Sequence, residues 1–206
     1  MKTKYPSYGD LIVVDFSKGA VNQNAELYCE YELPFFMGAT AGDRAKLEET
    51  IRQSKVSAVV APNAGRVPVI VQAIFEYLAR EFPSALKGYE GHIDESHQQT
   101  KPDPSGTALK WKPYLEEVGI KFDDMKSIRD DETQMSLGVP KKYLGGHGYH
   151  WITVRGNNVT LEINTKVNGR TTYGEGTVDG VRFLHKKVKE GSRGQVYSMV
   201  DAIKGV

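Results

Sequence analysis

The stretch Leu33–Asn63, LPFFMGATAGDRAKLEETIRQSKVSAVVAPN, decides the fold class of the first third of the chain. Two short apolar runs in it, Leu33–Met37 and Ser57–Val60, predict strands, and Asp43–Ser54 between them predicts a helix. A strand and a helix of the same kind precede this stretch, at Leu11–Val14 and Ala20–Cys29. Because strand and helix alternate, we expect a parallel α/β sheet of about three strands.

The rest of the chain predicts an α+β half with an open, largely antiparallel sheet. Trp151–Val154 and Val159–Val167 predict two strands joined at Gly156-Asn157-Asn158, a hairpin signal. One face of the second strand is apolar, so we expect that face to pack. The polar segment Gly119–Gly146 is expected to be a loop or an oligomer contact. The other expected elements are a helix at Val67–Phe82, a strand at Tyr89–Asp94, a helix at Thr107–Val118 that Pro113 kinks or limits, a helix at Gly180–Lys189, and a strand or short helix at Val196–Ile203.

Composition indicates a globular protein and argues against several functional classes. The chain has 206 residues, 39% of them hydrophobic and 26% charged, with a net charge of +1. A charge this small gives no broad attraction to nucleic acid or to a membrane surface. No apolar run reaches the length of a membrane span, and no signal peptide is visible. The single cysteine, Cys29, cannot form an internal disulfide, which favours the cytoplasm.

The run Glu95–Thr107, ESHQQTKPDPSGT, carries the chemistry that is most informative about function. Its Ser-Gly-Thr turn precedes a predicted helix, and the free backbone N–H groups at a helix N-terminus favour an anion. Lys101 would be a second positive anchor, and His97 could donate a proton to the bound molecule. The segment therefore predicts a site for a small acid.

Each of these residues also has a purely structural interpretation. His97 could be a loop histidine, Lys101 a solvated surface lysine, and Ser105 a helix cap. Capping and anion binding are compatible because both use the same N–H groups, and the combination of residues favours binding or catalysis. His147 and His150 are three residues apart, but no further ligands of suitable geometry are evident, so no metal is expected.

The same run resembles the substrate loop of the dihydrodipicolinate reductase family, whose pattern is approximately E-x-H-x-x-x-K-x-D-x-S-G-T-A. Further similarity to the plant-type branch of that family lies in Val14–Ser17, Met37–Gly42, Ala61–Asn63, Asn168–Arg170, Tyr173–Val181, Phe183-Leu184 and Lys186–Val188. The resemblance implies a truncated Rossmann-like sheet in residues 1–88. An α+β domain for substrate binding and oligomerisation would follow in residues 89–206, and the last helix of the chain could pack back on the first domain. The family's glycine-rich phosphate loop has no counterpart before residue 11.

The resemblance also implies roles for individual residues. His97 and Lys101 would be catalytic, and a small dicarboxylate would be the substrate. The expected substrate-binding residues are Gln98, Ser105, Gly106 and Thr107, and the residues expected near an NADPH or NADH cofactor are Gly38, Thr40, Asn63 and Arg170. Gln98 stands where the family often has a second histidine. A dimer or tetramer would form through the C-terminal sheet.

Two classes of function are consistent with these features. The first is nicotinamide-dependent reduction of 4-hydroxy-tetrahydrodipicolinate in lysine biosynthesis, as the resemblance implies. The second is a redox-free descendant, an isomerase, a cyclase or a small-acid binding protein that has lost nicotinamide binding. The substrate-side and nicotinamide-side similarities favour the first class. The absence of a glycine-rich phosphate loop favours the second.

Overall fold

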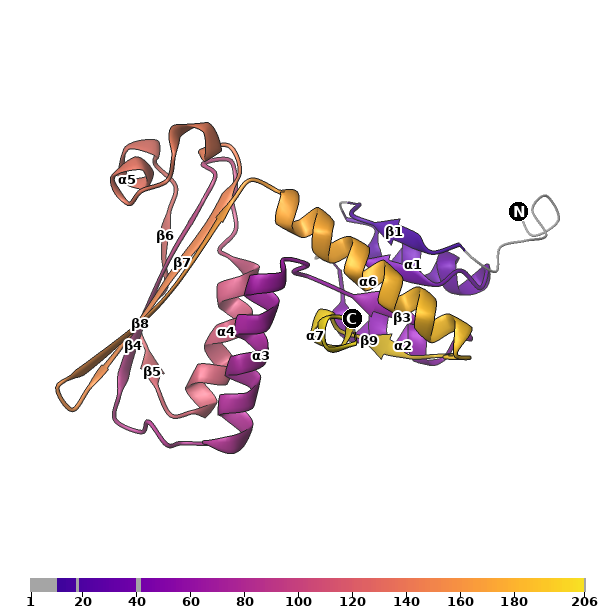
Figure 1. The fold of residues 1–206 in the computed structure, drawn as a ribbon, viewed down its shortest axis with the longest axis horizontal. Coiled ribbons are helices and arrows are strands. Elements are labelled where there is room, and N and C mark those ends of the chain that lie inside the picture. The colour runs from indigo at the N-terminus through magenta and orange to yellow at the C-terminus, as the bar shows by residue number, and fades with distance from the viewer. Residues whose placement is uncertain (1–10, 18, 40–41, 206) are drawn as a thin grey trace. The chain divides into compact units, whose positions relative to one another are not determined.

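The structure is a computed structural model that describes residues 11–17, 19–39 and 42–205. It divides into two compact units, Met1–Val69 with Tyr173–Val206, and Ile70–Thr172, and Figure 1 labels the elements of both. This division differs from the expected boundary between residues 88 and 89. The helix that precedes residue 88 packs its buried Phe75 into the core of the second unit, and the chain after residue 172 returns to the first unit.

The first unit contains a four-stranded parallel sheet. Its strands follow the order β1 (Val13–Asp15), β2 (Phe35–Met37), β3 (Ala58–Val60) and β9 (Val196–Tyr197). Its helices are α1 (Val21–Glu30), α2 (Arg44–Arg52), α6 (Thr171–Lys189) and α7 (Met199–Lys204). The parallel pairing of β1, β2 and β3 confirms the alternation predicted from the sequence. The last expected element proves to be both a strand and a short helix, β9 and α7.

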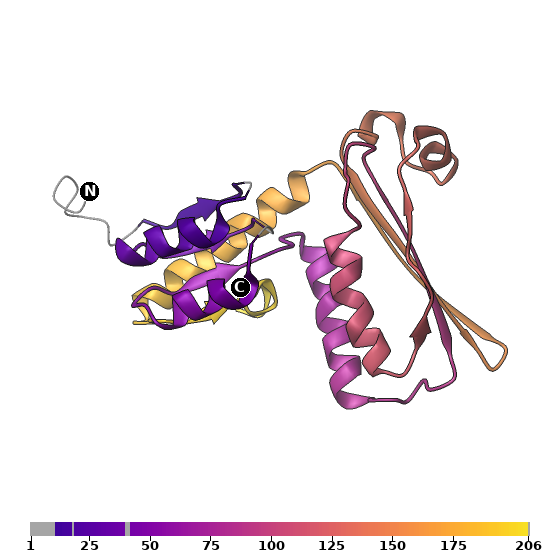
Figure 2. The same ribbon diagram turned by 180° about the vertical axis from the view of Figure 1, so that it is seen from behind.

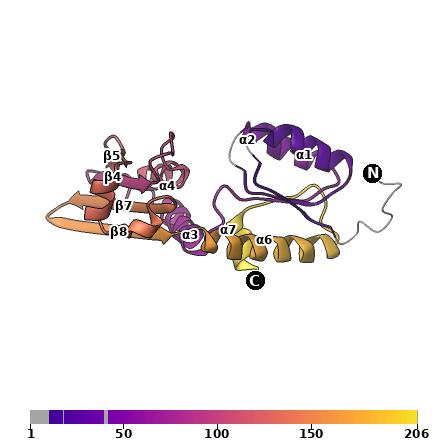
Figure 3. The ribbon, with the colours of Figure 1, turned by 90° about the horizontal axis from the view of Figure 1, so that it is seen from above.

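Side chains alternate across β2, so the two faces of the sheet pack on different helices. Phe35 and Met37 belong to the core that α1 and α2 cover. On the other face, the Phe36 ring lies against Gly180 of α6. Figure 3 shows α1 and α2 on one side of the strands and α6 on the other. A sheet that is covered on both faces explains why its strands are continuous apolar runs.

The second unit contains a five-stranded, mostly antiparallel sheet. The long strands are β4 (Glu90–His97), β7 (His147–Gly156) and β8 (Val159–Asn168), and two short strands, β5 (Lys121–Phe122) and β6 (Lys126–Ile128), pair in parallel with β4. The turn between β7 and β8 has positive φ at Asn157 and Asn158, as a tight hairpin requires. The fold class predicted from the sequence, a parallel α/β sheet and a mostly antiparallel sheet, is confirmed.

Two helices, α3 (Arg66–Glu81) and α4 (Gly106–Glu117), cover one face of this sheet and lie side by side (Figures 1 and 2). Phe75 of α3 and Trp111 of α4 pack edge to face, with Ile93 and Ile152 beneath them. The register places Ile163 of β8 beside Ile152, and Ile163 packs against the same core. The apolar alternation of β8 is therefore directed at helices of its own unit. Association of chains through this sheet stays a prediction.

Two expectations about local structure were wrong. Gly119–Gly146 is not irregular: besides β5 and β6 it contains α5 (Asp131–Ser136) and the 3₁₀ helix η2 (Lys141–Tyr143). Short polar elements of this kind have too few residues for periodicity to show. The last long helix begins at Thr171 and not at Gly180, since Gly176 and Gly180 allow close packing and do not end the helix. Within the described residues, no helix is long and apolar enough to cross a membrane.

Because α6 packs closely at Gly176, we expect a methyl group at this position to destabilise the protein. A Cβ atom built there would lie 1.7 Å from the carbonyl oxygen of Ala64, whereas one at Gly174, in the same helix, would meet nothing within 4 Å. We expect Gly176→Ala to lower the free energy of unfolding by about 2 kcal/mol or more, as overpacking does. Gly174→Ala should raise it by up to about 1 kcal/mol through helix propensity. Urea denaturation of both variants tests this, and equal effects would contradict the close approach.

Candidate functional site

The candidate site lies in the second unit, on the sheet face that α4 covers. Alternation along β4 places Glu95 and His97 on that face together with the core residue Ile93. The register sets Glu95 opposite His150 of β7, and His150 opposite Thr165 of β8. The loop after His97 then leads into α4, so that the predicted anion-binding turn and the predicted proton donor come from consecutive elements.

Glu95 is the most deeply buried charged group of the site, with 0% of its surface exposed. Arg129, which follows β6, donates to both carboxylate oxygens, at 2.6 and 3.0 Å, and Ser127 donates to one of them. Burial raises the pKa of Glu95, but hydrogen bonds from His97, Arg129 and Ser127 outweigh burial and lower the pKa to about 2. Glu95 is therefore an anion at neutral pH despite its burial.

His97 is held by this carboxylate. Its Nδ1 atom lies 2.6 Å from Oε2 of Glu95, and its side chain is 15% exposed. The ring also packs edge to face against His150, with 5.5 Å between the ring centroids. A carboxylate at Nδ1 fixes the orientation of the imidazole and favours a proton on that nitrogen, which leaves Nε2 as the nitrogen that can exchange a proton with a bound molecule.

Ser105 caps α4, and its buried hydroxyl also contacts His150. Its hydroxyl accepts a hydrogen bond from the backbone N–H of Ala108 and lies 2.6 Å from Nε2 of His150. Both Ser105 and His150 are buried, and Nδ1 of His150 lies 3.2 Å from the Thr165 hydroxyl. Burial, with a smaller contribution from the charge of His97, lowers the pKa of His150 to about 3, so His150 is neutral. The Ser105 side chain is thus directed into the protein.

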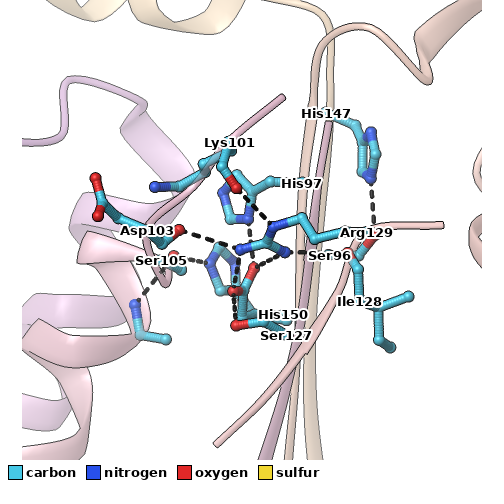
Figure 4. Close-up of polar contacts among 12 residues, drawn as sticks. Ser96, His97, Lys101, Asp103, Ser105, Ser127, Ile128, Arg129, His147 and His150 are labelled. Carbon is cyan, nitrogen blue, oxygen red and sulfur yellow. Dashed lines mark hydrogen bonds and ion pairs between the residues drawn. The ribbon is translucent and has the colours of Figure 1, made fainter. Parts of the chain in front are cut away.

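The remaining predicted substrate residues lie in the loop and at the start of α4. Gly106 is exposed, and a Cβ atom there would meet nothing within 4 Å, so its backbone is accessible to a ligand. In the loop, the Lys101 N–H donates to the carbonyl of Gln98, and both residues are half-buried. Figure 4 shows that the carbonyl oxygens of Lys101 and Asp103 accept hydrogen bonds from Arg129, at 3.1 and 3.2 Å. The binding roles of Gln98, Gly106 and Thr107 stay predictions.

The structure adds several residues that the sequence did not identify. Arg129 and Ser127 reach Glu95, Gln134 donates to the carbonyl of His97 at 2.7 Å, and Ser96 contacts His147 on the opposite face of the sheet. One signal was available in the sequence. Glu95 lies two positions after Ile93 in the same strand, so both side chains are on the inward face. A carboxylate that shares an inward face with an isoleucine requires a cationic partner.

The cofactor-binding roles expected for Gly38, Thr40, Asn63 and Arg170 stay predictions. Gly38 and Asn63 belong to the first unit and Arg170 to the second, and Thr40 lies outside the described residues. Gly38 has a packing reason, because a Cβ atom there would lie 2.1 Å from the Phe16 ring. Asn63 accepts a hydrogen bond from the Gly65 N–H in a local turn. Residues 11–17, 19–39 and 42–205 contain no group of three or more His, Cys, Asp or Glu residues arranged to hold a metal ion.

Comparison with known proteins supports the family resemblance that the sequence indicates. The family described as "Dihydrodipicolinate reductase, C-terminus" matches residues 69–203. The chain is 42% identical to a probable chloroplastic 4-hydroxy-tetrahydrodipicolinate reductase 1 of Oryza sativa subsp. japonica, over 96% of this chain and 59% of the relative. It is 39% identical to the chloroplastic 4-hydroxy-tetrahydrodipicolinate reductase 1 of Arabidopsis thaliana, over 99% of this chain and 60% of the relative. The chain thus spans about three fifths of these relatives.

A solved structure shows the same fold. Dihydrodipicolinate reductase from Paenisporosarcina sp. TG-14, determined with dipicolinate bound, matches with a TM-score of 0.62 and 16% sequence identity, over 93% of this chain and 73% of that one. At this identity the match shows the fold alone. The two plant relatives are named as chloroplastic, and the cytoplasm stays a prediction for this chain.

The neutral state of His150 predicts a dependence of stability on acid. Its folded pKa of about 3 lies below the ordinary value of 6.5, so between these values the unfolded chain binds a proton that the folded chain does not. The stability that neutral His150 supports is present above pH 6.5 and is lost as the pH falls toward 3. We expect His150→Gln to reduce the slope of unfolding free energy against pH by up to about 1.4 kcal/mol per pH unit in this window.

Urea denaturation of the wild type and His150→Gln from pH 8 to pH 4 measures this effect. At pH 8 both side chains are neutral, so the difference there reports packing and hydrogen bonding alone. If the unfolding free energies of the two proteins change in parallel from pH 6.5 to pH 4, His150 is not held neutral by the fold.

Proposed function

This chain belongs to the dihydrodipicolinate reductase family, and on that premise we propose that its second unit binds a small cyclic dicarboxylate for the reductase reaction of lysine biosynthesis. The observation that carries the proposal is the contact of 2.6 Å between His97 Nδ1 and the buried Glu95, two strand positions from each other and next to the loop that leads into α4. A histidine oriented by a buried carboxylate beside a helix N-terminus combines a proton donor with an anion site.

Charge explains the preference for a dicarboxylate. One carboxylate of the ligand would accept hydrogen bonds from the backbone N–H groups at the start of α4, where the helix dipole is positive. The accessible backbone of Gly106 supports this placement. Lys101 would bind the second carboxylate or strengthen the first contact, with charge-assisted hydrogen bonds in either case.

His97 would supply the proton of the reaction. The Glu95 carboxylate, whose pKa is held at about 2, stays ionised and stabilises the protonated imidazole at Nδ1. The proton on Nε2 is then available for the carbanion or amine that develops on the substrate. His150 stays neutral beneath the His97 ring and so adds no competing positive charge.

A nicotinamide cofactor would supply the hydride of this reaction. The 206 residues contain no G-x-G-x-x-G run to receive a pyrophosphate, and the cavity at the carboxyl ends of β2 and β3, lined by Ala39, Gly42 and Asp43 among others, measures about 80 Å³. These residues do not fit a whole dinucleotide, so no hydride step is assigned to them. A second candidate is a redox-free protein that binds or isomerises a small diacid, because the contact of His97 with Glu95 lies within the second unit alone.

Substitutions at Lys101 and His97 separate binding from proton transfer. We expect Lys101→Ala to weaken the binding of pyridine-2,6-dicarboxylate by about 1.5–3 kcal/mol, the range for a charged hydrogen bond. His97→Ala should retain binding but lower turnover of 4-hydroxy-tetrahydrodipicolinate about a hundredfold, measured with NADPH in large excess because weak nucleotide binding is expected. Lys112→Ala removes one positive charge from the outer face of α4 and serves as the control. Calorimetry measures the affinities, and unchanged affinity in Lys101→Ala would show that the dicarboxylate binds elsewhere.

The two candidate functions differ in nucleotide binding. For the 206-residue chain we expect weak or undetectable binding of NADH and NADPH, because the pyrophosphate has no glycine-rich turn at a helix N-terminus to accept it. Calorimetric titration with both nucleotides, with and without pyridine-2,6-dicarboxylate, provides the measurement. Micromolar affinity would show that another loop binds the phosphates, and it would favour the reductase over the redox-free protein.

A further inference from the structure

We infer that Arg129 is the positioning residue of the proposed site, because one guanidinium joins the carboxylate that orients His97 to the main chain of the loop that carries Lys101. The inference rests on the proposed function and deepens it. It concerns a residue of Gly119–Gly146, the segment that the sequence predicted to be a loop or an oligomer contact.

The first half of the link is the contact with β4. NH1 and NH2 of Arg129 donate to the two oxygens of Glu95, at 3.0 and 2.6 Å, in a bidentate arrangement. The Arg129 side chain is 20% exposed and Glu95 is 0% exposed, so water screens this pair only weakly. Without the guanidinium, the carboxylate that holds His97 Nδ1 would be a buried anion without its cation.

The second half of the link is the contact with the loop. Nε of Arg129 donates to the carbonyl of Lys101 at 3.1 Å, and NH2 donates to the carbonyl of Asp103 at 3.2 Å. These two carbonyls lie on either side of Pro102. Within the loop, the Lys101 N–H also donates a hydrogen bond to the carbonyl of Gln98. The loop is thus attached to the same group that fixes the proton donor, as Figure 4 shows.

The chemistry of this link requires arginine. Five contacts radiate from one planar group: two to Glu95, one each to the carbonyls of Lys101 and Asp103, and one at 3.0 Å to the carbonyl of Ile128. A lysine presents a single nitrogen with three donors and cannot span the carboxylate and both loop carbonyls. Arg129→Lys therefore keeps the charge and breaks the link.

The segment around Arg129 supports the same role from a second direction. Gln134 of α5 is fully buried, and its Nε2 donates to the carbonyl of His97 and to that of Ile128, at 2.7 and 3.2 Å. The orientation of His97 is therefore determined at its ring by Glu95 and at its main chain by Gln134. Both contacts depend on residues 127–134, so this segment positions a histidine that lies 30 to 37 residues earlier in the sequence.

The first experiment needs no ligand. Amide hydrogen exchange of Lys101, followed by NMR, reports the order of the loop. In Arg129→Lys the exchange should become about tenfold faster or more, because the loop loses its attachment. Ser127→Ala is the matched control, since it removes a hydrogen bond to the same Glu95 carboxylate and leaves the loop carbonyls untouched. Equal exchange in Arg129→Lys and the wild type, with both folded by circular dichroism, would overturn the inference.

The second experiment tests the consequence for the site. Arg129→Lys should weaken the binding of pyridine-2,6-dicarboxylate about tenfold, as the loss of charged hydrogen bonds does. Arg52→Lys makes the same change at an arginine that pairs with Glu48 in the first unit, and it should leave the binding unchanged. Arg129→Ala provides chemical rescue. Guanidinium at a low, non-denaturing concentration should restore part of the binding, whereas urea, which has the same shape without the charge, should not. Rescue by both or by neither would contradict a positioning role for the guanidinium.

The two levels of the proposal fail in different ways. Absence of binding in the wild-type protein removes the proposed function, and the exchange experiment still decides whether Arg129 orders the loop. Binding in the wild type that Arg129→Lys retains in full supports the proposed function and removes the positioning role.

Discussion

The arrangement of the candidate site depends on one buried charge, the carboxylate of Glu95. Because Glu95 lies two positions after Ile93 in β4, its side chain is on the same inward face as the isoleucine. An unpaired carboxylate there would cost several kcal/mol of stability. The chain supplies Arg129, Ser127 and His97 to that carboxylate, and their hydrogen bonds hold its pKa at about 2. The short parallel pairing of β6 with β4 is what brings Ser127 opposite Glu95. The pairing of β6 with β4 therefore contributes to the low pKa of Glu95.

The two histidines of the site, His97 and His150, occupy different environments. His97 is partly exposed and contacts a carboxylate, whereas His150 is almost fully buried between the Ser105 and Thr165 hydroxyls. Burial outweighs the nearby charge of Glu95, which acts to raise the pKa, so the pKa of His150 falls to about 3. The two rings pack edge to face, and the neutral His150 ring places no positive charge beside His97.

The first unit depends on a different constraint, which is close approach of backbone to backbone. Gly176 and Gly180 allow α6 to lie against Ala64 and the Phe36 ring, and Arg66 forms a bidentate pair with Asp179 of the same helix. A helix that appears broken by glycine in the sequence is continuous because those glycines are contact points. The C-terminal segment is in this way part of the unit that begins the chain.

The sequence by itself determined the fold class, three of the four strands of the first sheet, the β7–β8 hairpin and the chemical content of the run from Glu95 to Thr107. These features are local: apolar runs, Asn-Asn at a turn, and a Ser-Gly-Thr helix start have meaning within a few residues. It also indicated the family. Only the tertiary structure decided that Ser105 is directed toward His150, that α6 is unbroken, and that Arg129 joins Glu95 to the loop of Lys101. Those contacts join residues 28 to 45 positions apart in the sequence or depend on packing between segments, and no periodicity encodes which distant cation a buried carboxylate will meet.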